Sequence, residues 1–100
     1  MKKKKTRIAK PLSRAEINDI VGDILMRATY VTKPEGGFHP EQGLNTELGM
    51  DSVEIMEVLI ACDETFGIDI QDDEVETLQT VGDLCNIVEQ YLYPDGNPWN

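Results

Sequence analysis

The chain has 100 residues, of which 40% are apolar, and it carries a formal net charge of −10. This length and composition predict one small domain with a modest core, and they argue against two domains or a disordered chain. All nineteen acidic residues follow residue 15, whereas only two of the nine basic ones do, so residues 15–100 carry −17. Such a body repels phosphate backbones and anionic membranes, which argues against nucleic-acid binding. The acidic charge of residues 15–100 either attracts basic patches on other proteins or only keeps the protein in solution.

The N-terminal segment is basic and contains no long apolar stretch. It is therefore not a signal peptide, and no segment of the chain is apolar for long enough to span a membrane. We expect residues 1–12 to form a solvated tail, with weak contact to the acidic body, anionic lipid or RNA as alternatives. The two cysteines, Cys62 and Cys85, fit no metal or redox spacing and lie on apolar helix faces. They are expected to be core residues in a reducing cytoplasm.

The first predicted helix begins at Ser13, which forms a capping box with Glu16. The pair Tyr30-Val31 and Pro34 are predicted to end this helix. A long connection then runs to about residue 50, and such a loop in a compact domain is functional or anchored to the core, here through Leu44 and Leu48. The apolar residues of the helix recur at helical spacing: Ile17, Ile20, Val21, Ile24, Leu25 and Ala28.

Three further helical segments follow. The second helix is predicted from Asp51 to Phe66, where Gly67 stops it, and a short turn covers residues 72–76. The last helix begins at Thr80 and ends before Pro94. Three longer helices and one short one predict an all-α four-helix bundle with a long first loop. The folded domain is predicted over residues 13–93, between an N-terminal tail (1–12) and a C-terminal tail (94–100).

The second helix carries more apolar residues than one buried face requires. Its core face is predicted to contain Ile55, Val58, Leu59, Cys62 and Phe66. A second apolar group, Val53, Met56 and Ile60, lies on another face and is bordered by the acidic residues Glu54, Glu57 and Glu64. This second group either widens the contact with the core or forms an exposed patch for a partner.

Ser52 lies in the first turn of this helix, directly after Asp51, which can cap the helix together with Glu54. The unpaired N–H groups of a helix N-terminus favour a phosphate on such a hydroxyl. On spacing alone, however, the better explanation is that Asp51 and Ser52 are ordinary capping residues.

A resemblance to a known family adds to this interpretation. The segment Leu48-Gly49-Met50-Asp51-Ser52-Val53 resembles the phosphopantetheine attachment motif of acyl carrier proteins, L-G-x-D-S-L, with Val53 in place of leucine. The resemblance extends over about residues 13–92. Its further elements are Glu57, Asp63-Glu64, Phe66-Gly67-Ile68, Ile70 and Thr80-Val81-Gly82-Asp83-Leu84. The glycine-rich stretch of the first loop, residues 36–40, departs from the family pattern.

The resemblance implies a four-helix bundle of acyl-carrier type that carries acyl intermediates as thioesters. Ser52 matches the serine that accepts 4′-phosphopantetheine from coenzyme A through a phosphopantetheinyl transferase. The second helix matches the surface that docks on basic patches of synthase and acyltransferase enzymes. The partner-binding residues implied are Asp51, Val53, Glu54, Met56, Glu57 and Ile60. The chain, which starts at Met1, is expected to be a discrete, monomeric carrier in the cytoplasm and not an enzyme, for fatty-acid, polyketide or related synthesis.

Two alternatives remain. A peptidyl or aminoacyl carrier is less well matched, because those modules more often have two glycines before the modified serine, where this chain has Gly49-Met50. A non-carrier acidic adaptor or calcium binder is the other. An EF-hand loop starting at Asp63 would have Glu74 at position 12, but Ile68 stands where glycine is required, so no metal site is expected.

Overall fold

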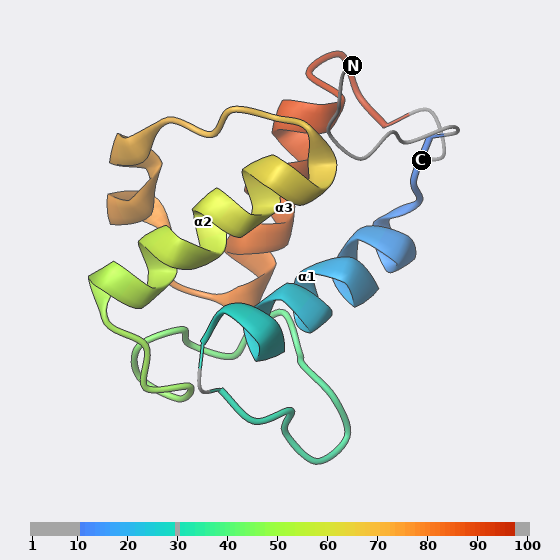
Figure 1. The fold of residues 1–100 in the computed structure, drawn as a ribbon. Helices are drawn as coiled ribbons and strands as arrows, with labels where there is room; N and C mark the ends of the chain where they lie inside the picture. The colour runs from blue at the N-terminus through green and yellow to red at the C-terminus, as the bar shows by residue number, and fades with distance from the viewer. Residues whose placement is uncertain (1–10, 30, 98–100) are drawn as a thin grey trace.

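The computed structural model describes residues 11–29 and 31–97, and these form four helical elements joined by loops (Figure 1). They are α1 (Arg14–Ala28), α2 (Ser52–Phe66), the 3₁₀ helix η1 (Asp72–Thr77) and α3 (Val81–Leu92). Within the described residues, β-pairing is limited to an isolated bridge between Gly43 and Thr80. The all-α architecture predicted from the sequence is confirmed. No helix of this described part has the length and apolar character needed to cross a membrane.

The helix boundaries follow from local capping. All three α-helices begin with a capping box, in which the residue before the helix and its third residue exchange hydrogen bonds: Ser13 with Glu16, Asp51 with Glu54, and Thr80 with Asp83. The Thr29 hydroxyl donates to the Leu25 carbonyl (2.7 Å) and accepts the Val31 N–H (3.0 Å). The helix α1 thus ends at Ala28, before Val31 and Pro34. Gly67 ends α2 in the left-handed conformation (φ 69°).

One hydrophobic core lies where α1 packs against both α2 and α3. The predicted core residues of α1 and α2 are buried, apart from Ile20 and Ala28, which are half-buried. Cys62 and Cys85 are buried free thiols, as predicted. Burial raises the pKa of the Cys62 thiol to about 12 and that of Cys85 to about 11, so neither forms a reactive thiolate near neutral pH.

The end of the first loop is paired with the start of α3. The Leu44 N–H donates to the Gln79 carbonyl (2.8 Å), and the Val81 N–H donates to the Gln42 carbonyl (3.0 Å). Leu44 is fully buried and is the loop's main apolar anchor. Leu48, the other predicted anchor, is half-buried. The loop therefore takes a defined path to the start of α2.

Gly82 is required by the close approach of the same loop to α3. Its N–H donates to the Pro40 carbonyl (2.8 Å), and a Cβ at this position would lie 2.9 Å from that oxygen and 3.1 Å from the Pro40 Cβ. Overpacking of this kind costs about 1–3 kcal/mol, which outweighs the gain in helix propensity of at most about 1 kcal/mol. We therefore expect Gly82→Ala to lower the free energy of unfolding, measured by urea denaturation.

The matched control for Gly82→Ala is Asn86→Ala, on the exposed side of α3. This control gains helix propensity without a new contact, so its free energy of unfolding should be unchanged or slightly higher. A Gly82→Ala protein as stable as the control would show that the approach of Pro40 does not restrict this position.

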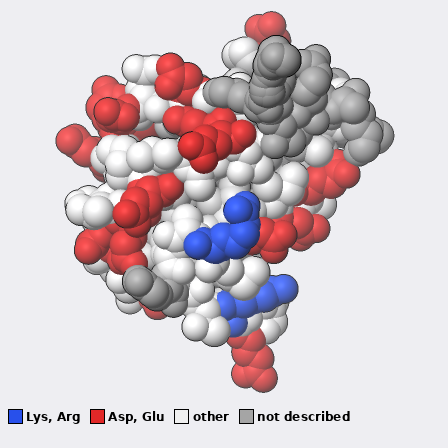
Figure 2. Space-filling view, viewed as in Figure 1, with Lys and Arg blue, Asp and Glu red and all other residues white. Residues whose placement is uncertain are grey.

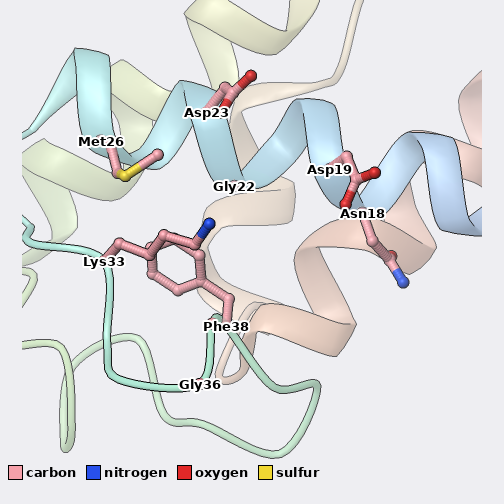
Figure 3. A pocket seen from close by; sticks show the side chains of 9 residues that line it. Asn18, Asp19, Gly22, Asp23, Met26, Lys33, Gly36 and Phe38 are labelled. Atoms are coloured by element: carbon pink, nitrogen blue, oxygen red, sulfur yellow. The ribbon is translucent and has the colours of Figure 1, made fainter.

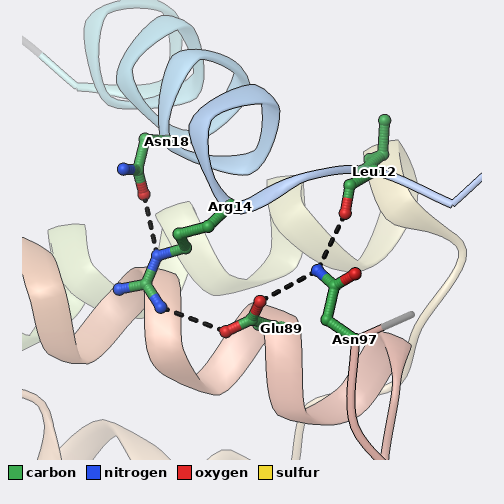
Figure 4. A network of polar contacts seen from close by, with 5 residues as sticks. All are labelled: Leu12, Arg14, Asn18, Glu89 and Asn97. Carbon is green, nitrogen blue, oxygen red and sulfur yellow. Dashed lines mark hydrogen bonds and ion pairs between the residues drawn. The ribbon is translucent and has the colours of Figure 1, made fainter. Parts of the chain in front are cut away.

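A polar network joins the start of α1 to the chain segment after α3 (Figure 4). The Asn97 side-chain amide is buried and donates to the Leu12 carbonyl (2.8 Å) and to Glu89 Oε2 (2.9 Å). Glu89 Oε1 pairs with Arg14 Nη1 (3.1 Å), and the Leu12 N–H donates to the Tyr93 hydroxyl (2.6 Å). The point at which the chain enters α1 is thereby fixed. The domain boundaries at residues 13 and 93 stay a prediction, and Asn97 belongs to this packed end of the bundle.

Candidate functional site

The segment before α2 is held by contacts to the core and the loop. Met50 is buried (1% exposed), and its N–H donates to the Leu44 carbonyl (2.9 Å). The Asn45 side-chain amide donates to the Met50 carbonyl (2.9 Å), and Gly49 adopts a positive φ of 72° that L-residues rarely take. The chain therefore turns at Gly49, buries Met50 and emerges directly into α2.

Ser52 is the first residue of α2 and is exposed to solvent. Asp51 precedes it as the helix cap: its Oδ1 accepts the Glu54 N–H (2.8 Å), and Glu54 Oε1 accepts the Asp51 N–H (3.2 Å). This capping box therefore accepts the backbone N–H groups of Asp51 and Glu54, which lie on either side of Ser52 in the sequence. Among the described residues, the Ser52 hydroxyl itself makes no hydrogen bond. It is thus a fixed but uncovered hydroxyl at the positive end of a helix dipole.

The described residues around Ser52 include no base in contact with its hydroxyl. A serine hydroxyl needs an adjacent base to act as a nucleophile, and none of the described side chains is hydrogen-bonded to Ser52. The only histidine, His39, lies exposed in the first loop. In the part of the chain that the structure describes, no three His, Cys, Asp or Glu side chains are grouped to hold a metal ion. The Asp63 carboxylate, where an EF-hand would start, accepts the Ile70 N–H (2.9 Å).

The three residues of the second apolar group of α2 differ in their exposure to solvent. Val53 is 65% exposed and Ile60 is 52% exposed, and they are the large apolar side chains that stand out on the described surface. Met56 is half-buried. Val53 and Ile60 are therefore exposed on the surface of α2, whereas Met56 is partly covered.

Val53 and Ile60 belong to a longer exposed row, which we call the α2 stripe: Val53, Glu57, Ile60 and Glu64. The spacing of four, three and four residues places these side chains on one face of the helix. Apolar and acidic side chains alternate along it, and α2 contains no basic residue. Figure 2 shows acidic groups around uncharged surface on the half of the molecule that holds α2; on this face, the basic groups of the described residues lie at the centre and below it.

A groove of about 510 Å³ lies elsewhere, between α1 and the first loop (Figure 3). Phe38 packs against Gly22 of α1, where an added Cβ would lie 3.2 Å from the Phe38 ring. Asp19, Asp23 and Lys33 are among its lining residues, none of which comes from α2. The groove was not predicted from the sequence, and its only sequence signal is the pair of a mid-helix glycine and a glycine-rich loop.

Comparison with known proteins places the chain in a family. Residues 16–88 match a family model described as "Phosphopantetheine attachment site". An acyl carrier protein of Acidothermus cellulolyticus is 35% identical over 77 residues, which cover 77% of this chain and 89% of the relative. The chain therefore belongs to the acyl carrier protein family of phosphopantetheine-binding carriers.

Family membership defines the chemistry in outline. Members are carrier proteins and not enzymes, and they bear a covalently attached 4′-phosphopantetheine. The residues around Ser52 fit such a group, because the hydroxyl is exposed and makes no hydrogen bond among the described residues. The helix N-terminus also favours the phosphate of the linkage. The sequence did not identify Asn45 and Met50 as residues that position this site, since no periodic pattern marks contacts within a loop.

Proposed function

We propose that Ser52 is the attachment point of 4′-phosphopantetheine and that the protein tethers acyl intermediates as thioesters on that arm. The observation that carries this proposal is the placement of Ser52: an exposed hydroxyl on the first residue of α2, two residues after the buried Met50. The attachment point is rigid, whereas the arm and its cargo extend into solvent. The reactive thiol belongs to the prosthetic group, because Cys62 and Cys85 are buried.

In this proposal, other proteins activate the Ser52 hydroxyl. Among the described residues, no base contacts the Ser52 hydroxyl, so a phosphopantetheinyl transferase supplies the base that removes its proton. The hydroxyl oxygen then attacks the β-phosphorus of coenzyme A, forming a phosphodiester and releasing adenosine 3′,5′-bisphosphate. Thioester formation and transfer occur in synthase and acyltransferase enzymes.

The docking surface proposed for these enzymes lies on α2. Its exposed acidic and apolar side chains complement a basic surface with an apolar centre. Glu54 and Met56 are half-buried, so the outermost contacts come from Val53, Glu57 and Ile60. The proposed partner-binding residues are Asp51, Val53, Glu54, Met56, Glu57 and Ile60. The cytoplasm is the proposed compartment, in line with the two free buried cysteines, and the working form is a monomer.

The cargo is an acyl intermediate of fatty-acid, polyketide or related lipid synthesis. The similarity to an acyl carrier protein favours this cargo over a peptidyl or aminoacyl group.

The experiment that tests the carrier role is recovery of the protein from its own host under conditions that preserve thioesters. We expect a fraction of the molecules to bear an acyl chain that neutral hydroxylamine releases, and mass spectrometry of the released hydroxamate identifies the pathway. Released aminoacyl or peptidyl hydroxamates would favour the peptidyl carrier alternative. Protein without any prosthetic arm would favour the acidic adaptor and contradict the proposal.

A further inference from the structure

Two features of the chain are complementary and are not explained by the attachment site. Residues 1–10 contain six basic residues and no acidic one, while the α2 stripe alternates acidic and exposed apolar side chains. We infer that residues 1–10 of this chain bind the α2 stripe within the same molecule and compete with basic partner surfaces. The binding stands on the charges and the geometry alone, whereas the competition rests on the proposed docking function of α2.

The position from which this segment leaves the bundle is fixed. Both backbone polar groups of Leu12 are hydrogen-bonded: its N–H donates to the Tyr93 hydroxyl, and its carbonyl accepts the Asn97 amide. Arg14 is paired with Glu89. Figure 1 shows α1 and α2 running in opposite directions, so that α1 begins at the end of the bundle where α2 finishes. The chain therefore enters α1 next to the C-terminal half of α2, which carries Ile60 and Glu64.

The segment is long enough for this contact. Ten residues span up to about 35 Å when extended, whereas the fifteen residues of α2 are about 22 Å long. A tether of this length keeps the basic residues near the stripe at a local concentration on the order of millimolar. That concentration matters because each exposed ion pair is weak by itself and is screened by salt.

The other strongly acidic surface fits the segment less well. Residues 69–76 contain five acidic residues, but η1 lies on the side of the molecule away from the start of α1 (Figure 1). The Glu74 carboxylate there already accepts the Tyr91 hydroxyl (3.0 Å). Among the described residues, the exposed large apolar side chains are Val53 and Ile60, both on α2. Within that part of the chain, only the α2 stripe therefore offers both a negative charge and an apolar contact for the single branched aliphatic residue of the segment, Ile8.

The test compares the full chain with a variant in which all six basic residues of the segment become glutamine, K2Q/K3Q/K4Q/K5Q/R7Q/K10Q. Amide and methyl NMR shifts are recorded at 50 mM and 500 mM salt and at two protein concentrations. We expect the substitutions to shift the resonances of Glu57, Ile60 and Glu64 at low salt and much less at high salt, independently of protein concentration. The reciprocal variant E57Q/E64Q should remove the part of the Ile60 shift that depends on the segment.

Three outcomes would overturn the inference. They are unchanged α2 resonances, shifts centred on residues 69–76, and shifts that grow with protein concentration, which would indicate binding to a second copy. Unchanged α2 resonances together with binding of the wild-type segment to anionic vesicles or RNA would show that another surface is its target.

The competition is measured separately with a phosphopantetheinyl transferase and coenzyme A. We expect the glutamine variant to lower the KM for this protein by on the order of two- to ten-fold at 50 mM salt, with no effect at 500 mM. An unchanged KM alongside segment-dependent shifts would overturn the competition, and with it α2 as this transferase's docking surface, while the contact would stand.

Discussion

Replacing Ser52 by alanine is expected to abolish loading by a phosphopantetheinyl transferase completely, because we propose that its hydroxyl oxygen is the atom that forms the phosphodiester. The wild-type protein should gain one phosphopantetheine mass when incubated with coenzyme A and the transferase. The variant should remain at its starting mass with an unchanged circular dichroism spectrum. Its fold is preserved because the Ser52 side chain is exposed and makes no hydrogen bond among the described residues.

The matched control is Ser13→Ala, since Ser13 is the only other serine in the chain. Ser13 also lies at a helix start, where its hydroxyl accepts the Glu16 N–H (3.2 Å). Its loss is expected to lower the free energy of unfolding by about 1 kcal/mol and to leave loading intact. Loading of the Ser52→Ala protein, or loss of loading in Ser13→Ala while the protein stays folded, would contradict the assignment of Ser52.

Replacing Leu44 by alanine is expected to have the largest effect on stability that we predict for the first loop. Leu44 is fully buried, its N–H donates to the Gln79 carbonyl, and its carbonyl accepts the Met50 N–H. Removal of a buried leucine side chain costs about 2–5 kcal/mol, since the cavity is only partly filled by relaxation. Urea denaturation monitored by circular dichroism measures the loss.

Leu48→Ala is the matched control for Leu44→Ala, because Leu48 lies in the same loop but is only half-buried. Its free energy of unfolding should fall clearly less. Equal losses in the two variants would show that Leu44 is not the main anchor of the loop, and the positioning of Met50 through Leu44 would then need another explanation.

Local rules were sufficient to predict the helices. The capping boxes at Ser13, Asp51 and Thr80 each involve residues only three apart, so the sequence contains all the information for the helix starts. The pairing of the first loop with residues 79–82 and the contact of Asn97 with Leu12 join distant parts of the chain. Such contacts depend on how the helices pack, and helical periodicity does not describe them.

The candidate site was predictable in part. The interpretation of Ser52 came from the resemblance of residues 48–53 to the attachment motif, because spacing alone allows an ordinary capping serine. Periodicity placed Val53, Met56 and Ile60 off the main core face but left their exposure open. Burial depends on which neighbours cover that side of α2, and the structure leaves Val53 and Ile60 uncovered but not Met56.

The central claim, that Ser52 carries the prosthetic arm, is tested most directly by locating the arm in the loaded wild-type protein. Proteolysis followed by fragment-ion mass spectrometry should find the added mass in the peptide that spans Asp51–Met56, on Ser52 itself. An arm on Ser13, on a threonine or on a cysteine thiol would contradict the claim. So would protein that stays unmodified under conditions that load a control carrier.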